Sequence, residues 1–160
     1  MLHSNTIILW EGDAMTPGRE TREKKRHSTA LIPYSYYVCR IPMDFINVPM
    51  HWHEEFELNR IFSGRGEFLC GDAKFEVEEG DILMIPPNML HAIYPWEGCE
   101  LCYRALVFSP VLLGINSNDR CTNECVRPFV AGNVRMNVRI DRKSGSYAEL
   151  GAITDRIFSC

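Results

Sequence analysis

The chain has 160 residues, of which 46% are hydrophobic, and its formal net charge is −4 at neutral pH. This length and apolar fraction predict one globular domain with one sizeable core. A net acidic chain lacks the clustered positive charge that phosphate binding requires, so we do not expect these residues to bind nucleic acid by themselves. No apolar run approaches the ~20 residues of a membrane span, and no signal-peptide pattern is evident at the N-terminus.

Seven cysteines are an odd number with no visible disulfide framework, a usage typical of a reducing cytoplasm. Cys99 and Cys102 differ in strand parity, which disfavours a shared zinc ion because the two would face opposite sides of one strand. Cys121 and Cys125 are four residues apart, and we interpret them as the buried stripe of a short helix. The prediction is a cytoplasmic protein without a structural zinc site.

Residues 1–30 are predicted to form an N-terminal arm. The run from Arg19 to Arg26 is highly charged and has no apolar periodicity. A nucleic-acid contact and a solvated, mobile connector are both compatible with such a run. The interleaved Glu20 and Glu23 favour the connector.

Residues 31–113 contain short segments rich in strand-forming residues, separated by turns. The predicted strands are 36–41, 55–62, 67–70, 74–77, 81–85, 91–94 and 101–108. Gly71-Asp72 is a two-residue hairpin signal, and Pro86-Pro87 ends a strand because proline cannot donate to a ladder. Roughly seven or eight short strands at this spacing predict a mainly β, jelly-roll barrel.

The segment His51-Trp52-His53-Glu54-Glu55-Phe56-Glu57 carries most of the candidate metal ligands. On one continuous strand His51, His53 and Glu57 would point to the same side. His91 follows a predicted hairpin, and a returning strand could bring it back to them. Three imidazoles and a carboxylate inside a barrel suit Zn²⁺, Ni²⁺, Fe²⁺ or Mn²⁺.

Two alternatives remain open at this segment. Buried histidines and glutamates are often held by hydrogen bonds alone, so the same side chains could simply form the wall of a pocket. Glu55 shares the parity of Glu57, and a twist or bulge near Phe56 must decide which carboxylate faces inward.

Residues 114–160 are predicted to be a helical dimerisation or linker region. Asn118 or Asp119 could cap a short helix, and Ser146 with Glu149 matches a capping box. A stripe of apolar residues follows at helical spacing: Leu150, Ile153 and Ile157. That stripe is too narrow for an isolated helix in water, so we expect it to form a homodimer contact; the alternative is that it packs back on its own barrel. The helix reaches Cys160 without a stop signal, which suggests that the natural protein continues.

The spacing H-x-H-x3-E-x6-G from His51 to Gly64 and the run Gly80 to His91 resemble the two cupin motifs. Phe45, Asn88 and Pro95 stand where the motifs usually have glycine, glycine and asparagine. Together with Leu106-Val107-Phe108-Ser109-Pro110, the segment also resembles the N-terminal sensor domain of AraC-type bacterial transcription regulators. This similarity covers about half of the chain.

The resemblance implies a cupin double-stranded β-helix with an N-terminal arm and C-terminal helices. It also implies a small polar metabolite as effector inside the barrel, pairing of two copies, and DNA binding only through a separate C-terminal domain absent from these residues. Arg40 matches a pocket arginine of the arabinose-sensing member and Tyr103 another sugar contact, whereas Ala105 replaces a stacking tryptophan, so arabinose itself is not implied. Glu55, by its inward parity, is the third candidate effector residue.

Two classes of function remain open. The first is a ligand-sensing regulatory module without catalysis, which the arm and the amphipathic C-terminal helix favour. The second is a small metal-dependent cupin enzyme, such as an isomerase or a dioxygenase, which the complete set of four ligands favours.

Overall fold

A computed structural model describes residues 18, 21–134 and 136–159. Strands dominate the described chain: β1 (Tyr34–Ile41), β2 (Val48–His51), β3 (Phe56–Cys70), β4 (Ala73–Glu78), β5 (Ile82–Ile85), β6 (His91–Pro95), β7 (Leu101–Phe108) and β8 (Arg139–Ile140). The helical segments follow β7: η2 (Pro110–Leu113), η3 (Thr122–Val126), α1 (Arg127–Val130) and α2 (Tyr147–Phe158). Among these described helices, none is long and apolar enough to cross a membrane.

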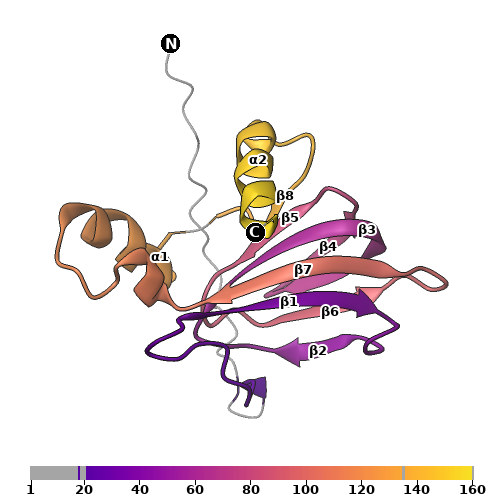
Figure 1. The fold of residues 1–160 in the computed structure, drawn as a ribbon, viewed down its shortest axis with the longest axis horizontal. Helices are drawn as coiled ribbons and strands as arrows, with labels where there is room; N and C mark the ends of the chain where they lie inside the picture. Colours follow the sequence, from indigo (N-terminus) through magenta and orange to yellow (C-terminus); the bar gives the residue numbers. More distant parts are fainter. Residues whose placement is uncertain (1–17, 19–20, 135, 160) are drawn as a thin grey trace.

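Strand β3 belongs to two antiparallel sheets. Its first part pairs with β7 and β5, and its second part pairs with β4 and β6 (Figure 1). The register with β7 shifts between Ile61 and Ser63, and the change of partners follows at Gly64, where pairing with β7 ends, and Arg65, where pairing with β4 begins. The sequence pattern predicted two strands here, because Ser63-Gly64-Arg65-Gly66 resembles a turn; instead the chain bends without breaking its ladder. The bend closes the two sheets into a barrel.

The space between the sheets is a filled apolar core. Residues of β7 alternate between buried and half-buried, as expected for a strand with one face inward. Side chains of this core are Cys39, Ile41, Ile61, Phe68, Cys70, Val77, Leu83, Ile85, Ile93, Leu101, Tyr103 and Ala105. A group of polar side chains enters this interior at one end, where β2 ends and β6 begins, and forms the candidate site.

Helix α2 packs on the outside of the barrel near β5 and β8 (Figure 1). Phe158 is buried beside Tyr36 and Phe62, and Leu150 packs on the same cluster. Two polar contacts fix the helix further: Arg60 Nε donates to Asp155 at 2.9 Å, and the hydroxyl of Tyr147 donates to the Gly80 carbonyl at 2.8 Å.

Two expectations for residues 114–160, the capping box and the buried cysteines, are corrected, and the structure shows which side of α2 faces the barrel. The Ser146 side chain makes no capping hydrogen bond, so the capping box is wrong. The inward face of α2 uses Gly151, Thr154 and Phe158, whereas Ile153 and Ile157 are 46% and 40% exposed. Cys121 and Cys125 are exposed rather than buried, because the helix buries the face that carries Thr122.

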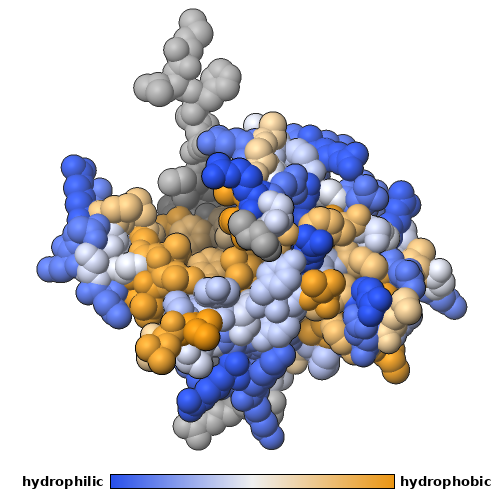
Figure 2. Space-filling model, viewed as in Figure 1, coloured by the Kyte–Doolittle hydropathy of each residue, from blue (hydrophilic) through white to orange (hydrophobic). Residues whose placement is uncertain are grey.

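Apolar surface remains outside the core. Figure 2 shows hydrophobic side chains over the barrel and beside α1, bordered by hydrophilic ones. Exposed apolar residues include Tyr36 and Val38 on β1, and Ile153 and Ile157 on α2. On β1 this exposure follows from strand alternation, since Cys39 and Ile41 point into the core and the even-numbered residues point outward.

Candidate metal centre

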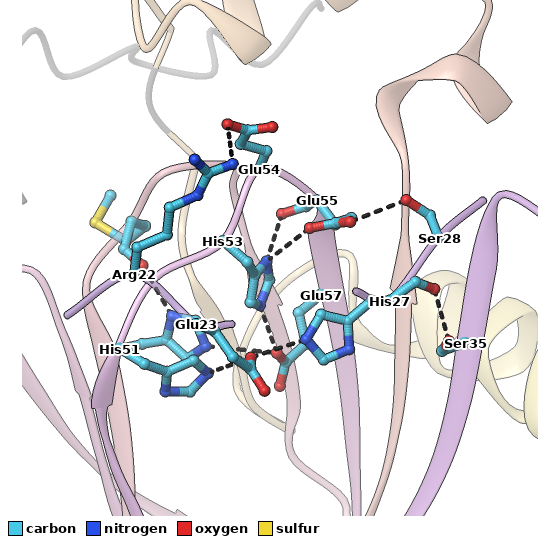
Figure 3. A network of polar contacts seen from close by, with 12 residues as sticks. Arg22, Glu23, His27, Ser28, Ser35, His51, His53, Glu54, Glu55 and Glu57 are labelled. Atoms are coloured by element: carbon cyan, nitrogen blue, oxygen red, sulfur yellow. Dashed lines mark hydrogen bonds and ion pairs between the residues drawn. The ribbon is translucent and has the colours of Figure 1, made fainter. Parts of the chain in front are cut away.

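Four side chains meet at one end of the barrel. His51, His53, Glu57 and His91 each offer a ligand atom, and these atoms all lie within 4.8 Å of one another. His53, Glu57 and His91 are buried, and His51 is half-buried. Figure 3 shows His51, His53 and Glu57 pointing toward a common centre. The predicted convergence of these four residues is therefore realised.

The elements that position them differ from the single strand that was expected. His51 ends β2 and lies opposite His91, the first residue of β6. The chain then bends at Glu54 and Glu55 before β3 begins, so the parity argument does not extend across the segment. This bend turns Glu57, rather than Glu55, toward the histidines.

The turn before His91 is fastened to the same bend. Asn88 adopts a left-handed backbone with φ of 64°, at the place where the cupin motif usually has glycine. Asparagine is among the few non-glycine residues that tolerate this region. The backbone N–H of Asn88 donates to the carbonyl of His53 at 2.7 Å, which links the two histidine-bearing segments.

A backbone carbonyl fixes the ring orientation of each histidine. Nδ1 of His51 contacts the Pro49 carbonyl at 2.9 Å, Nδ1 of His53 that of Glu55 at 3.1 Å, and Nδ1 of His91 that of Met89 at 2.8 Å. Because a carbonyl can only accept, each Nδ1 carries the proton and donates it. All three Nε2 atoms are thereby directed into the centre, an arrangement typical of metal-binding histidines.

With the protons of the histidines on Nδ1, the Nε2 atoms and the Glu57 carboxylate are hydrogen-bond acceptors that face one another, and they outnumber the donors. Nε2 of His53 lies 3.1 Å from Glu57 Oε2, and Nε2 of His91 lies 3.4 Å from the same oxygen. The amide of Asn59 donates to the other carboxylate oxygen of Glu57 at 2.8 Å. Nε2 of His91 is fully buried and has no hydrogen-bond partner. A buried polar atom without a partner is costly, and a cation would satisfy it.

Burial and contacts between the side chains of the cluster determine the pKa values of its ionisable groups. Burial raises the pKa of the Glu57 carboxyl, but its contacts with His53 and His91 outweigh burial and hold that pKa well below its usual range. Burial disfavours charge on His53, yet the neighbouring Glu57 raises the pKa of His53 above its usual value. Burial, together with the nearby His91, lowers the pKa of His51. The carboxylate thus requires a positive charge, from a proton on His53 or from a metal ion.

The residues fit a divalent transition metal. Neutral imidazole nitrogens and one carboxylate are the donor set of many Zn²⁺, Ni²⁺, Fe²⁺ and Mn²⁺ sites. The orientation of each ring by a carbonyl and of Glu57 by Asn59 supplies the outer contacts that such sites use. An ion held here would polarise an oxygen of a bound ligand as a Lewis acid.

The three candidate effector residues lie in different places. Tyr103 is buried in the barrel, and burial raises the pKa of its hydroxyl well above the usual value. Glu55 lies beside the cluster, where it accepts from Ser28 at 2.9 Å. Arg40 is not in the barrel: its side chain is exposed on the outward face of β1 and is paired with Asp44 at 3.0 Å.

The arm adds two residues that the sequence pattern did not single out. Glu23 Oε2 lies 2.8 Å from His27 Nε2 and 3.5 Å from His51 Nε2 (Figure 3). His27 is buried, and its ring centre lies 5.3 Å from that of His53. Burial opposes ionisation of Glu23, but its hydrogen bond with His27 lowers the pKa of that carboxyl. The available signal was a Glu and a His four residues apart, but Glu23 lies inside the charge run and His27 directly follows it.

The described part of the arm is docked, which corrects the expectation of a solvated connector. Arg22 pairs with Glu54 at 2.6 Å and stacks on Trp52, and Lys25 lies 4.1 Å from the centre of the Tyr37 ring. The sequence pattern does not reveal these contacts, because the partners of Arg22 and Lys25 are distant in the chain. Arg19 and Glu20 of the run lie outside the described residues.

Comparison with known proteins gives two sequence matches. A family model described as AraC-like ligand binding domain matches residues 36–122. The chain is also 33% identical over 90 residues to an uncharacterized HTH-type transcriptional regulator of Bacillus subtilis (strain 168), YdeC, and this match covers 56% of the chain and 31% of the regulator. The chain therefore spans about a third of the length of that relative.

Among solved structures, the chain is similar to a cupin protein from Bacteroides fragilis, with 25% identity and a TM-score of 0.45 over 51% of this chain and 70% of that one. A predicted oxalate decarboxylase from Thermotoga maritima is 22% identical, with a TM-score of 0.45 over 48% of this chain and 68% of that one. The strand pairing and the helices after β7 confirm the fold class predicted from the sequence: a mainly β, double-sheet barrel followed by helices.

Proposed function

The chain belongs to the AraC-like ligand-binding domain family, and from this membership we propose that it is the effector-sensing part of a transcription regulator. The observation that carries the proposal is the cluster of three histidines and Glu57 at the arm-covered end of the barrel. In a packed apolar core, this is where a few polar anchors could hold a small molecule.

The proposed effector is a small polar metabolite held by a divalent transition metal at the cluster. Tyr103 and Glu55 are the candidate anchors beyond the metal ligands, because one lies in the barrel and the other beside His53. Arg40 has no part in the proposed site, since its guanidinium is exposed and paired with Asp44.

The proposal includes partners outside the described residues. DNA would be bound by a separate C-terminal domain, and the protein would act in the cytoplasm. Two copies would pair through the exposed side of α2, where Ile153 and Ile157 present apolar surface to solvent. An exposed apolar helix face of this kind is a common protein–protein contact.

A metal-dependent enzyme is the second candidate. The observation that favours it is the fully buried Nε2 of His91, which points to a metal that could also activate a substrate. A sensor and an enzyme would share the ligand set, and they differ in whether the bound compound is converted.

The test combines metal binding with thermal denaturation. Zn²⁺, Ni²⁺, Mn²⁺ or Fe²⁺ at about a hundred times its Kd should stabilise the fold by about 2.7 kcal/mol, which raises the Tm by about 5 to 10 °C. His53→Ala should weaken metal binding by at least about tenfold, whereas Arg40→Ala, on the outer surface, should not change it. Polar metabolites added to the metal-loaded protein should raise the Tm further without being consumed. Conversion of the stabilising compound, lost in His53→Ala, would instead establish the enzyme.

A further inference from the structure

The arm is fixed across the segment that bears two of the proposed ligands. Trp52, between His51 and His53, donates its backbone N–H to the Thr21 carbonyl at 3.0 Å and accepts from the Glu23 N–H at 2.9 Å. The indole N–H of Trp52 also donates to the Gly18 carbonyl at 3.1 Å. These bonds form a short parallel bridge, so the position of the Glu23 backbone relative to the histidines is set by backbone hydrogen bonding.

The side chain of Glu23 turns toward the cluster. Its Oε2 lies 3.5 Å from Nε2 of His51, the nitrogen that the Pro49 carbonyl leaves available for a metal ion. Its side chain is 27% exposed, whereas its neighbour Arg22 turns outward to Glu54. Two ligand atoms that each lie about 2.1 Å from one metal ion are at most about 4.2 Å apart, so the distance between Glu23 Oε2 and His51 Nε2 is compatible with a shared ion.

His27 holds Glu23 at this position. Its Nε2 contacts Glu23 Oε2 at 2.8 Å, and its Nδ1 contacts the hydroxyl of Tyr37 at 2.9 Å. The carbonyl of His27 accepts from the hydroxyl of Ser35 at 2.6 Å, which attaches this part of the arm to β1. His27 is therefore a positioning residue, and Glu23 is the group that reaches the cluster.

We propose that Glu23 is a further ligand of the metal, supplied by the arm, and that metal binding at the barrel end fastens residues 21–28 over it. This inference rests on the proposed metal site and adds the arm to it. A carboxylate ligand adds a negative charge beside Glu57, which favours a divalent ion over a proton. The metal alone would then change the accessibility of the arm before any metabolite binds.

The arm carries its own reporter of this change. Lys24, Lys25 and Arg26 follow Glu23 directly, and their side chains are exposed. Trypsin would cleave the backbone after these residues when the arm is released from the barrel. Fastening through Glu23 lowers the population of the released arm, and cleavage at these residues slows in proportion.

The test compares Glu23→Gln with Glu54→Gln in the full chain. The first keeps shape and hydrogen bonding but removes the charged ligand; the second removes the ion pair with Arg22, an arm contact away from the cluster. Zn²⁺ affinity is measured by competition with a chromophoric chelator, and tryptic cleavage at 24–26 is followed with and without Zn²⁺. We expect Zn²⁺ binding to weaken by about tenfold or more in Glu23→Gln and to stay within about twofold of wild type in Glu54→Gln. Zn²⁺ should slow cleavage in wild type and in Glu54→Gln but not in Glu23→Gln.

The outcomes separate the two proposals. Wild-type affinity in Glu23→Gln, or cleavage that Zn²⁺ slows equally in that variant, would overturn the role of Glu23 and leave the four-residue site standing. A wild-type chain that binds neither Zn²⁺ nor, in the same assay, Ni²⁺, Mn²⁺ or Fe²⁺ would overturn both. Circular dichroism of the metal-free variants controls for folding.

Discussion

Asp119 shows how one side chain can organise the start of a helix. Its carboxylate accepts from the Thr122 N–H and the Thr122 hydroxyl, both at 2.9 Å, and from the hydroxyl of Ser117. The hydrogen bond from Ser117 and those from Thr122 lower the pKa of Asp119 to about 2. Of the two predicted caps, Asn118 and Asp119, the structure therefore uses Asp119.

The lowered pKa predicts a pH dependence of stability. Because the folded pKa of about 2 lies below the unfolded value of ~3.9, Asp119 stabilises the fold fully above pH ~4. That contribution is lost as the pH falls from ~4 through about 2. Carbon-detected NMR should find the Asp119 carboxyl titrating near the lower value, and Asp119→Ala should flatten the acid limb of Tm against pH. An Asp119 carboxyl that titrates near 4 would contradict the hydrogen bonding described here.

For single residues, the sequence predicted which side chains form the candidate metal centre but not how they are oriented. The identity of His51, His53, Glu57 and His91 followed from residue type and spacing. Their orientation depends on carbonyls and on a bend at Glu54 and Glu55, which alternation along one strand cannot represent. Arg40 was placed inward by resemblance alone, whereas the alternation of β1 turns it outward.

The element that shapes the barrel is β3, and Gly64 is its tightest point. Gly64 has φ of 86°, and a Cβ built there would lie 1.7 Å from the carbonyl oxygen of Glu100. Only glycine allows this close approach of two backbones. The sequence predicted that Gly64-Arg65-Gly66 closes a strand, whereas in the structure Gly64 bends a strand that continues to Cys70.

Gly64→Ala should therefore destabilise the protein strongly. The left-handed backbone alone costs an alanine about 1–2 kcal/mol, and the contact with Glu100 adds to it, so we expect a total loss above about 2 kcal/mol. Gly145→Ala is the matched control, because its Cβ would meet nothing within 4 Å. Urea denaturation should give a midpoint near wild type for the control and a much lower one for Gly64→Ala; equal midpoints would show that the bend tolerates a side chain.

At the scale of the whole molecule, α2 has two apolar sides with different partners. Phe158 and Leu150 face the barrel, and Ile153 and Ile157 face solvent. The sequence placed the helix and its apolar stripe correctly along the chain. It could not assign the inward side, because the barrel also accepts the small residues Gly151 and Thr154 against its surface.

Substitution on the two sides of α2 should have separable effects. Ile153→Asp with Ile157→Asp should convert a dimer to a monomer in sedimentation equilibrium and leave the melting of the isolated subunit nearly unchanged. Phe158→Ala should instead lower the free energy of unfolding by about 3–5 kcal/mol, since it empties a buried site. Dimer mass that persists in the double variant would exclude this face as the interface.

The sharing of β3 between two sheets also has a consequence for the time that the chain needs to fold. Neither sheet can be completed before β3 is in place, and β3 pairs with distant segments, as Phe56 with Phe108. Strand β1 in turn pairs with β7, where Tyr34 also lies opposite Phe108. Closing loops of this length costs chain entropy, and that cost comes before the stabilising contacts between the strands can form. The barrel should therefore fold in milliseconds to seconds rather than microseconds. His51 and His91 are likewise brought together only by pairing across forty residues, so the complete four-residue cluster is a product of this long-range folding and not of local structure.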